Sequence, residues 1–98
     1  MTIEITDNSV LSRYEITVDG VLGGFAEYHD DGSSIVFPHT LIDPSMRGRG
    51  LAAQLVRRAL DDASAANRTV VAQCWYVAQF IDEHPDYAHL LAPSPPQA

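Results

Sequence analysis

The sequence predicts an α/β (α+β) domain: a mixed, mostly antiparallel sheet with a β-α-β crossover and C-terminal helices. Three observations support this class. Apolar and polar residues alternate over much of the first 42 residues, as they do in half-buried strands. From Gly50 the apolar residues repeat with helical spacing instead. A short apolar run at residues 69–74 then fits a largely buried strand, so strand, helix and strand follow one another as a right-handed crossover.

Four segments of the N-terminal half have strand character. Asp19-Gly20 is a two-residue hairpin signal, and residues 30–32 turn the chain again. Pro38 has no N–H to give to a neighbouring strand, so it predicts a bulge or an unpaired stretch inside the fourth segment. The predicted strands cover residues 3–5, 14–18, 21–28 and 34–42.

The C-terminal half has helical character. The apolar stripe on residues 52–63 predicts an amphipathic helix, and Asn67 is a stop signal beyond it. Apolar residues of the segment 75–83 also fall at helical spacing. Pro85 suits the first position of a last short helix, which we expect over residues 86–91.

Length and charge limit the number of domains and the kinds of partner. The chain has 98 residues and a formal net charge of -7, which predicts one domain at residues 1–91 followed by a flexible proline-rich tail at 92–98. The acidic balance argues against nucleic acid as a partner. No apolar run is long enough to cross a bilayer, so we expect no membrane insertion and a cytoplasmic location. The single cysteine, Cys74, predicts a free thiol, and the absence of lysine excludes Schiff-base chemistry.

The most informative motif is a glycine-arginine turn, Arg47-Gly48-Arg49-Gly50, placed directly before the first predicted helix. The first turn of a helix has free backbone N–H groups and the positive end of the helix dipole. Glycines let an oxygen-rich ligand approach that backbone closely. Five of the six arginines lie between residues 47 and 68, although the whole chain is acidic. The turn therefore predicts an anion-binding site.

The turn continues into Leu51-Ala52, and the six residues match the arginine-x-x-glycine-x-glycine/alanine box of the GNAT N-acetyltransferase superfamily. Further landmarks before and after the box occur in the same order as in that family. They are His39-Thr40-Leu41-Ile42, Asp43-Pro44, Cys74-Trp75-Tyr76 and His84-Pro85-Asp86-Tyr87. Over about residues 3–91 the chain resembles the very small single-domain GNAT-like acetyltransferases. This resemblance implies the acyl-CoA N-acyltransferase (GNAT-like) fold.

The resemblance also implies that the chain binds acetyl-CoA (coenzyme A). Backbone N–H groups of the box would hold the pyrophosphate, and the pantetheine arm would run between the fourth and fifth strands. The thioester would then lie near His39 and Cys74. The residues implied in cofactor binding are Leu41, Ile42, Arg47, Gly48, Arg49, Gly50, Leu51 and Ala52.

Acetyl transfer to an amine needs a base, a donor that polarises the thioester carbonyl, and a proton for the leaving thiolate. The candidate catalytic residues are His39, Cys74 and Tyr76. An imidazole suits the base at neutral pH, but His39 has an equal structural interpretation as a hydrogen-bonded strand residue. Cys74 is either a small buried apolar residue or a nucleophile, and Tyr76 or Tyr87 would protonate the thiolate. The histidines and the cysteine show no metal-ligand spacing, so we expect no metal site.

The function that this site implies is acetyl-CoA-dependent N-acetyltransfer to an amine. Only residues 7–12 separate the first two predicted strands, where larger members of the superfamily place helices over the acceptor. The acceptor side should therefore be open, which suits an amine of a protein, a peptide or another bulky molecule. Three alternatives stay open. The first is a non-catalytic module that binds coenzyme A or acetyl-CoA, and the second is an acyl enzyme that uses Cys74 with His39 as its base. The third is a plain interaction domain with the arginines on a solvated helix face.

Overall fold

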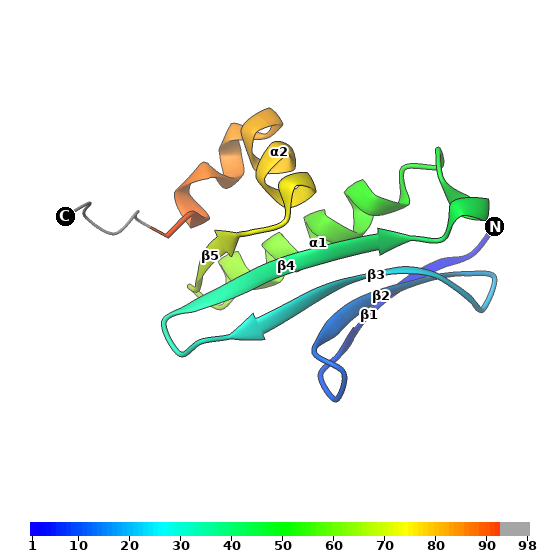
Figure 1. Ribbon diagram of the computed structural model, residues 1–98, viewed down its shortest axis with the longest axis horizontal. Coiled ribbons are helices and arrows are strands. Elements are labelled where there is room, and N and C mark those ends of the chain that lie inside the picture. Colours follow the sequence, from blue (N-terminus) through cyan, green and yellow to red (C-terminus); the bar gives the residue numbers. More distant parts are fainter. Residues whose placement is uncertain (93–98) are drawn as a thin grey trace.

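The computed structural model describes residues 1–92 and shows one five-stranded sheet in the order β1-β2-β3-β4-β5 (Figure 1). Strands β1 to β4 pair antiparallel, and β5 pairs parallel to β4. The elements within these residues are β1 (Ile3–Asn8), β2 (Arg13–Val18), β3 (Val21–Asp30), β4 (Ser34–Ile42), the 3-10 helix η1 (Pro44–Met46), α1 (Leu51–Ala65), β5 (Thr69–Ala72), α2 (Trp75–Glu83) and the 3-10 helix η2 (Pro85–Leu90).

This arrangement confirms the predicted α+β class, with its mostly antiparallel sheet, its β-α-β crossover and its C-terminal helices. The predicted helix at 52–63 lies within α1, and the one at 75–83 is α2. The last predicted helix, at 86–91, is the 3-10 helix η2. Strand β1 extends beyond the predicted residues 3–5 because it pairs with the whole of β2.

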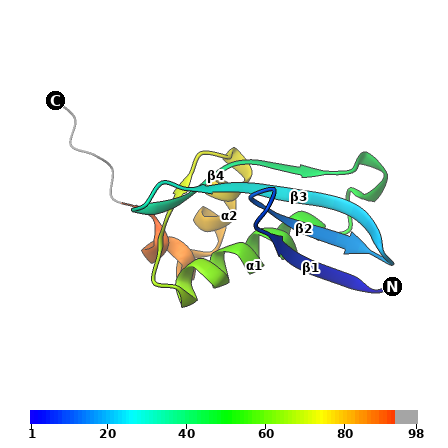
Figure 2. The same ribbon diagram turned by 90° about the horizontal axis from the view of Figure 1, so that it is seen from below.

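Both α-helices lie on one face of the sheet. Their buried residues pack with Tyr14 and Ile16 of β2 and Phe37 of β4 into a single core. Figure 2 shows α1 along this side of the sheet, whereas no described element covers the opposite side. On the uncovered face, the Phe25 ring lies next to the His39 ring and under the Arg13 guanidinium group. The buried α1 residues are Leu51, Leu55, Val56, Ala59, Leu60 and Ala63.

A bulge in β4 confirms the interpretation of Pro38. Between β3 and β4, Glu27 pairs with His39 and His29 pairs with Val36. β4 therefore has one more residue than β3 between these two pairs. An extra residue reverses the alternation of side chains along the rest of a strand. Thr40 therefore lies opposite Ala26 on the helix-covered face, and His39 lies on the uncovered face.

The predicted strand at 69–74 is too long, because β5 ends at Ala72 and Cys74 instead caps the N-terminus of α2. The Cys74 backbone N–H donates to the Phe37 carbonyl over 2.8 Å. The next β4 residue, Pro38, has no N–H with which to continue the parallel ladder. β5 therefore pairs over its whole length, but only with the first half of β4.

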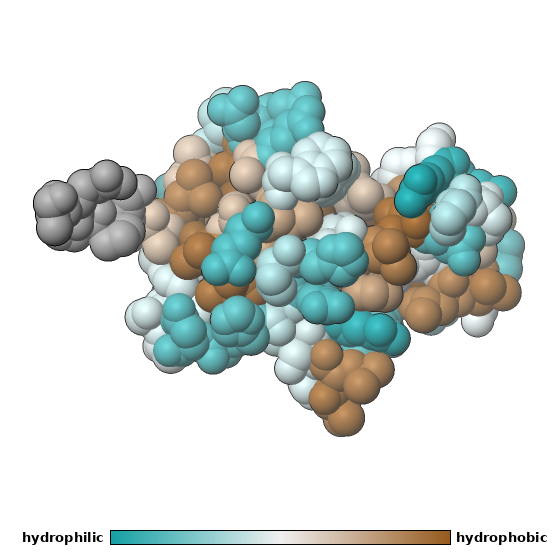
Figure 3. All heavy atoms as spheres, viewed as in Figure 1, coloured by the Kyte–Doolittle hydropathy of each residue, from teal (hydrophilic) through white to brown (hydrophobic). Residues whose placement is uncertain are grey.

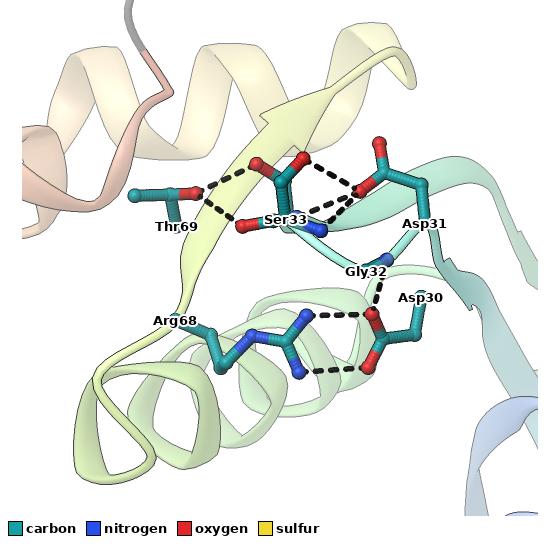
Figure 4. Close-up of polar contacts among 7 residues, drawn as sticks. Asp30, Asp31, Gly32, Ser33, Arg68 and Thr69 are labelled. Carbon is teal, nitrogen blue, oxygen red and sulfur yellow. Dashed lines mark hydrogen bonds and ion pairs between the residues drawn. The ribbon is translucent and has the colours of Figure 1, made fainter.

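At the paired end, a polar network joins the β3–β4 turn to the start of β5 (Figure 4). Arg68 donates to both carboxylate oxygens of Asp30, over 2.7 and 2.6 Å. The Thr69 hydroxyl donates to the Ser33 carbonyl and lies 2.6 Å from the Ser34 hydroxyl. These contacts fix β5 beside β4 at this end.

The first residue of the predicted tail at 92–98 is part of the described structure. Ala92 donates its backbone N–H to the Val70 carbonyl over 2.9 Å, so it still belongs to the described fold. Residues 93–98 lie outside the described part of the chain, and the proline-rich tail stays a prediction for them.

Candidate functional site

The candidate site lies where β4 and β5 separate. Residues 38–42 of β4 pair with β3 on one side, and they have no β5 partner on the other because β5 ends opposite Phe37. Backbone polar groups on an unpaired strand edge need a partner from elsewhere. This edge is thus open to a ligand that brings its own hydrogen-bonding groups.

A cavity of about 740 Å³ occupies this separation and continues to the start of α1. Its volume falls within the usual range for sites that hold a small molecule or a cofactor. β4, α2 and the segment before α1 form its walls. The lining residues are Pro38, His39, Thr40, Ile42, Met46, Arg47, Gly48, Gly50, Leu51, Ala52, Ala53, Gln73, Cys74, Trp75 and Tyr76.

Nine of the eleven predicted site residues line this cavity, and two do not. Leu41 lies opposite Phe25 on the uncovered face of the sheet, and Arg49, within the box, is exposed. Thr40, Met46 and Gln73 also line the cavity, although they were not predicted to do so. A signal for Thr40 was available, because a bulge at Pro38 exchanges the faces of all later β4 side chains.

The start of α1 is built for close approach of a ligand to the backbone. Gly48 and Gly50 have φ angles of 82° and 73°, a left-handed conformation that side chains rarely adopt. A Cβ at either position would meet no atom within 4 Å, so the space beside both glycines is open. Gly50 caps α1, and no side chain bonds the free N–H groups of its first turn. Arg47 adds positive charge at the same place.

Cys74 and His39 both line the cavity, but Cys74 contacts Thr40 on the helix-covered face of β4, whereas His39 lies on the uncovered face. The Cys74 thiol is buried and donates to the Thr40 hydroxyl over 3.7 Å. The His39 ring lies edge-on to the Phe25 ring, with 6.2 Å between ring centroids. Within the described residues, no basic side chain forms a hydrogen bond or an ion pair with the thiol. The geometry therefore separates the two groups that an acyl-cysteine route would need together.

Aromatic residues at the start of α2 form the remaining wall. Tyr76 is half-buried, and burial, followed by the nearby Glu83 carboxylate, raises the pKa of its hydroxyl. A raised pKa keeps the hydroxyl protonated, so it can give up a proton to a stronger base. Trp75 packs edge-to-face on Tyr76 and is largely exposed at the rim. Tyr87, the alternative proton donor, is not a lining residue, and its hydroxyl donates to Asp61.

The connection between β1 and β2 is a short turn at residues 9–12, with no helix over the sheet. It projects from the lower edge of the molecule, where Figure 3 shows exposed apolar atoms. Val10 on this turn is 91% exposed. The uncovered face of the sheet therefore reaches the cavity wall at His39 without an obstruction from this turn, in agreement with the expected open side.

The described residues hold no group of three or more histidine, cysteine or acidic residues that could bind a metal ion. No helix in residues 1–92 is both long and apolar enough to cross a membrane. The cytoplasmic location stays a prediction.

Fold and site together define an α+β domain of the acyl-CoA N-acyltransferase type, with a helix N-terminus and two separating strands around one cavity. The chain belongs to the GCN5-related N-acetyl-transferase family, whose family model matches residues 13–90. This match confirms the resemblance inferred from the box and its landmarks.

Individual relatives agree with this assignment. Protein NATD1 of Bos taurus is 36% identical over 59 residues, which are 59% of this chain and 52% of that protein. The chain thus matches about half the length of this curated relative. A GCN5-like protein from Staphylococcus aureus, solved by NMR, has the same fold with a TM-score of 0.71 and 17% identity, covering 94% of this chain and 90% of the other. AAC(6')-Iy, solved with a bisubstrate analogue of CoA, gives a TM-score of 0.55 and 18% identity, covering 88% of this chain and 65% of the other.

Proposed function

We propose that this chain is an acetyl-CoA-dependent N-acetyltransferase that acts on an amine of a protein, a peptide or another bulky acceptor. The observation that carries the proposal is the cavity that joins the open start of α1 to the unpaired edge of β4. Family membership supports the reaction, and the CoA-derived ligand of AAC(6')-Iy supports the cofactor.

In this proposal the cofactor follows the cavity from one end to the other. Its pyrophosphate lies on the backbone N–H groups at Gly48 and Gly50, with Arg47 beside the phosphates. Ile42 and the rest of the unpaired β4 edge face the pantetheine arm. The thioester then lies between Thr40 and Tyr76, beside the Cys74 thiol.

The reaction proposed is direct transfer. The acceptor amine reaches the thioester from the uncovered face of the sheet, where His39 takes the proton from the ammonium group. The amine nitrogen then attacks the carbonyl carbon, the carbon–sulfur bond breaks, and the nitrogen loses its second proton to solvent as the amide forms. Tyr76 gives its proton to the leaving thiolate and regains one from solvent. Cys74 lines the acyl group without attacking it, because its thiol is buried and contacts the Thr40 hydroxyl rather than a basic side chain.

Calorimetry with acetyl-CoA tests the site. We expect micromolar binding that weakens as salt screens the phosphate contacts. Arg47→Ala should weaken binding roughly tenfold, whereas Arg58→Ala, which changes an α1 residue outside the cavity, should change it much less. An absence of binding at low salt would exclude both the proposed transferase and the alternative of a non-catalytic coenzyme A-binding module.

Two variants test the chemistry, with turnover measured on a peptide amine panel. His39→Ala should remove the pH dependence of kcat near neutrality, and Cys74→Ala should keep measurable turnover. Intact-mass analysis after incubation with acetyl-CoA alone should show no acetyl adduct on Cys74. A stoichiometric adduct that disappears when the acceptor is added would establish the acyl-cysteine route instead. Tight binding of acetyl-CoA without turnover of any amine would favour the non-catalytic coenzyme A-binding module.

A further inference from the structure

A second cavity lies between the sheet and the C-terminal half of α1. It has a volume of about 270 Å³ and shares no lining residue with the first cavity. Its walls come from all of the first four strands, from α1 and from the start of β5. The lining residues are Asp7, Tyr14, Tyr28, Ile35, Phe37, Ala59, Asp62, Ala63, Ala66 and Arg68. Nothing in the proposed transfer reaction uses this cavity.

Three aromatic rings form a continuous wall on the sheet side of this cavity. The ring centroids of Tyr14 and Tyr28 are 5.5 Å apart, and those of Tyr28 and Phe37 are 6.5 Å apart. Opposite them, α1 contributes the small side chains of Ala59 and Ala63 and the Asp62 carboxylate. Tyr14 and Phe37 are 7% and 2% exposed and Tyr28 is half-buried, so the Tyr28 ring is the most accessible of the three. An accessible ring face attracts cations through the ring quadrupole.

Two carboxylates hold the tyrosines in place. The Tyr28 hydroxyl donates to Asp7 over 2.6 Å, and the Tyr14 hydroxyl donates to Asp62 over 2.9 Å. Burial, with the carboxylate hydrogen bond, raises the pKa of Tyr28 to about 12 and raises that of Tyr14 as well. Both hydroxyls therefore stay protonated at neutral pH and remain donors to the two carboxylates next to the rings.

The charges around the cavity do not cancel. Arg68 is paired with Asp30 at 2.6 Å, and Arg58 is paired with Asp62 at 3.2 Å. Among the described residues, Asp7 forms no ion pair. Three carboxylates and two guanidinium groups thus leave one negative charge, and it is located at the carboxylate that holds the Tyr28 ring.

We propose that this second cavity binds a small organic ammonium ion, with its charged group between Asp7 and the Tyr14 and Tyr28 rings. A single positive charge matches the one unbalanced carboxylate, and an apolar body matches the ring wall and the alanines of α1. A neutral ligand of the same shape would gain the apolar contacts but not the charge interactions. An anion would meet Asp7 and Asp62 together. The proposed ammonium site uses only residues of the second cavity, so it does not depend on the proposed transferase function.

The test is an NMR titration of the full chain with choline, at constant ionic strength, against its uncharged isostere in which carbon replaces the nitrogen. Choline should shift the ring signals of Tyr14 and Tyr28 saturably, and the isostere should bind roughly tenfold more weakly. The indole signal of Trp75, which lies in the first cavity, should not move, and saturation of the chain with coenzyme A should not change the titration. Equal binding of both probes would overturn the proposal, as would an absence of saturable shifts.

Matched variants separate the charge from the ring. Asp7→Asn should weaken choline binding roughly tenfold, whereas Asp86→Asn, an exposed carboxylate on η2, should leave it unchanged. Tyr28→Phe keeps the ring and should retain binding, whereas Tyr28→Leu removes the ring and should lose it. Thermal unfolding checks each variant. Because Asp7 is exposed, Asp7→Asn should fold even if Tyr28→Leu does not, and unchanged choline affinity in Asp7→Asn contradicts the proposal.

Discussion

The two ends of the β4–β5 pair differ in where their backbone hydrogen bonds go. At the closed end, β4 and β5 pair from Ser34–Thr69 to Phe37–Ala72, and Asp30, Arg68 and their neighbours hold the turns together. At the open end, residues 38–42 of β4 have no β5 partner, and this edge of β4 borders the larger cavity. The same two strands thus provide stability at one end and a ligand site at the other.

This difference shows how a small domain can leave part of its backbone unpaired. An unpaired edge in a sheet is a cost to stability unless something satisfies it. The polar network at the closed end fixes the position of β5, so the strands can diverge beyond Phe37 without losing their register. Changes at one end should therefore affect coenzyme binding, and changes at the other should affect stability.

The strongest effect should come from a pair of glycines, one at each end. Gly50 and Gly32 have φ angles of 73° and 95°, and a Cβ at either position would meet no atom within 4 Å. Valine at either position is strained, so both variants should lose about 1 kcal/mol or more of stability. Gly50→Val should also reduce acetyl-CoA affinity at least roughly tenfold, because its side chain takes the space beside the helix N–H groups. Gly32→Val should bind normally.

Calorimetry on both variants measures this contrast, after circular dichroism confirms that each is folded. An equal loss of affinity in the two variants would mean that the phosphates are held away from the start of α1. It would also remove the functional difference between the two ends.

The next effect is on stability at the open end. A Cβ on Gly24 would overlap the Leu41 carbonyl oxygen and lie 2.6 Å from Ile42 Cδ1, so β4 would have to move. Gly24→Ala should lower the free energy of unfolding by about 2 kcal/mol. Gly23→Ala should cost less, because its Cβ meets the flexible end of Met46 at 2.9 Å. Urea unfolding of both variants gives the comparison, and equal costs would contradict the close packing of β3 on β4.

The weakest effect should be a pH dependence at the closed end. The hydrogen bonds from Arg68, followed by that from the Gly32 N–H, lower the pKa of Asp30 from 3.8 to about 2. A carboxyl pKa that is lower in the folded state stabilises the fold above the ordinary pKa, and this contribution disappears as pH falls toward about 2. Asp30→Asn should therefore be less stable than the native chain at neutral pH, with the difference closing in acid. Thermal unfolding across this range measures it.

The control for this prediction is Asp82→Asn, which changes an exposed carboxylate on α2, away from the Arg68 network. Its difference from the native chain should not depend on pH in the same way. A constant difference for Asp30→Asn down to the lowest pH would show that the Asp30–Arg68 pair does not respond to protonation. Coenzyme affinity should be unchanged in both variants at neutral pH.

Features that depend only on neighbouring residues could be predicted from the amino-acid sequence. The Asp19-Gly20 hairpin, the amphipathic α1 and the bulge at Pro38 follow from local backbone preferences and from the period of the apolar residues. The box before α1 follows in the same way, because a helix start carries its free N–H groups and its dipole wherever it lies. These local features predicted the fold class and an anion-binding site before α1. Nine of the residues around the larger cavity were predicted by the family resemblance that the box and its landmarks carry.

Features that depend on register and on contacts between distant segments were settled only in the folded chain. The bulge places Thr40 beside Cys74 and turns His39 toward Phe25, and counting along an uninterrupted strand gives the opposite result. The second cavity brings together four strands and one helix, so no local pattern predicted it. A side chain's direction along a strand reverses with each added residue, and its neighbours across the sheet are set by pairing rather than by sequence distance.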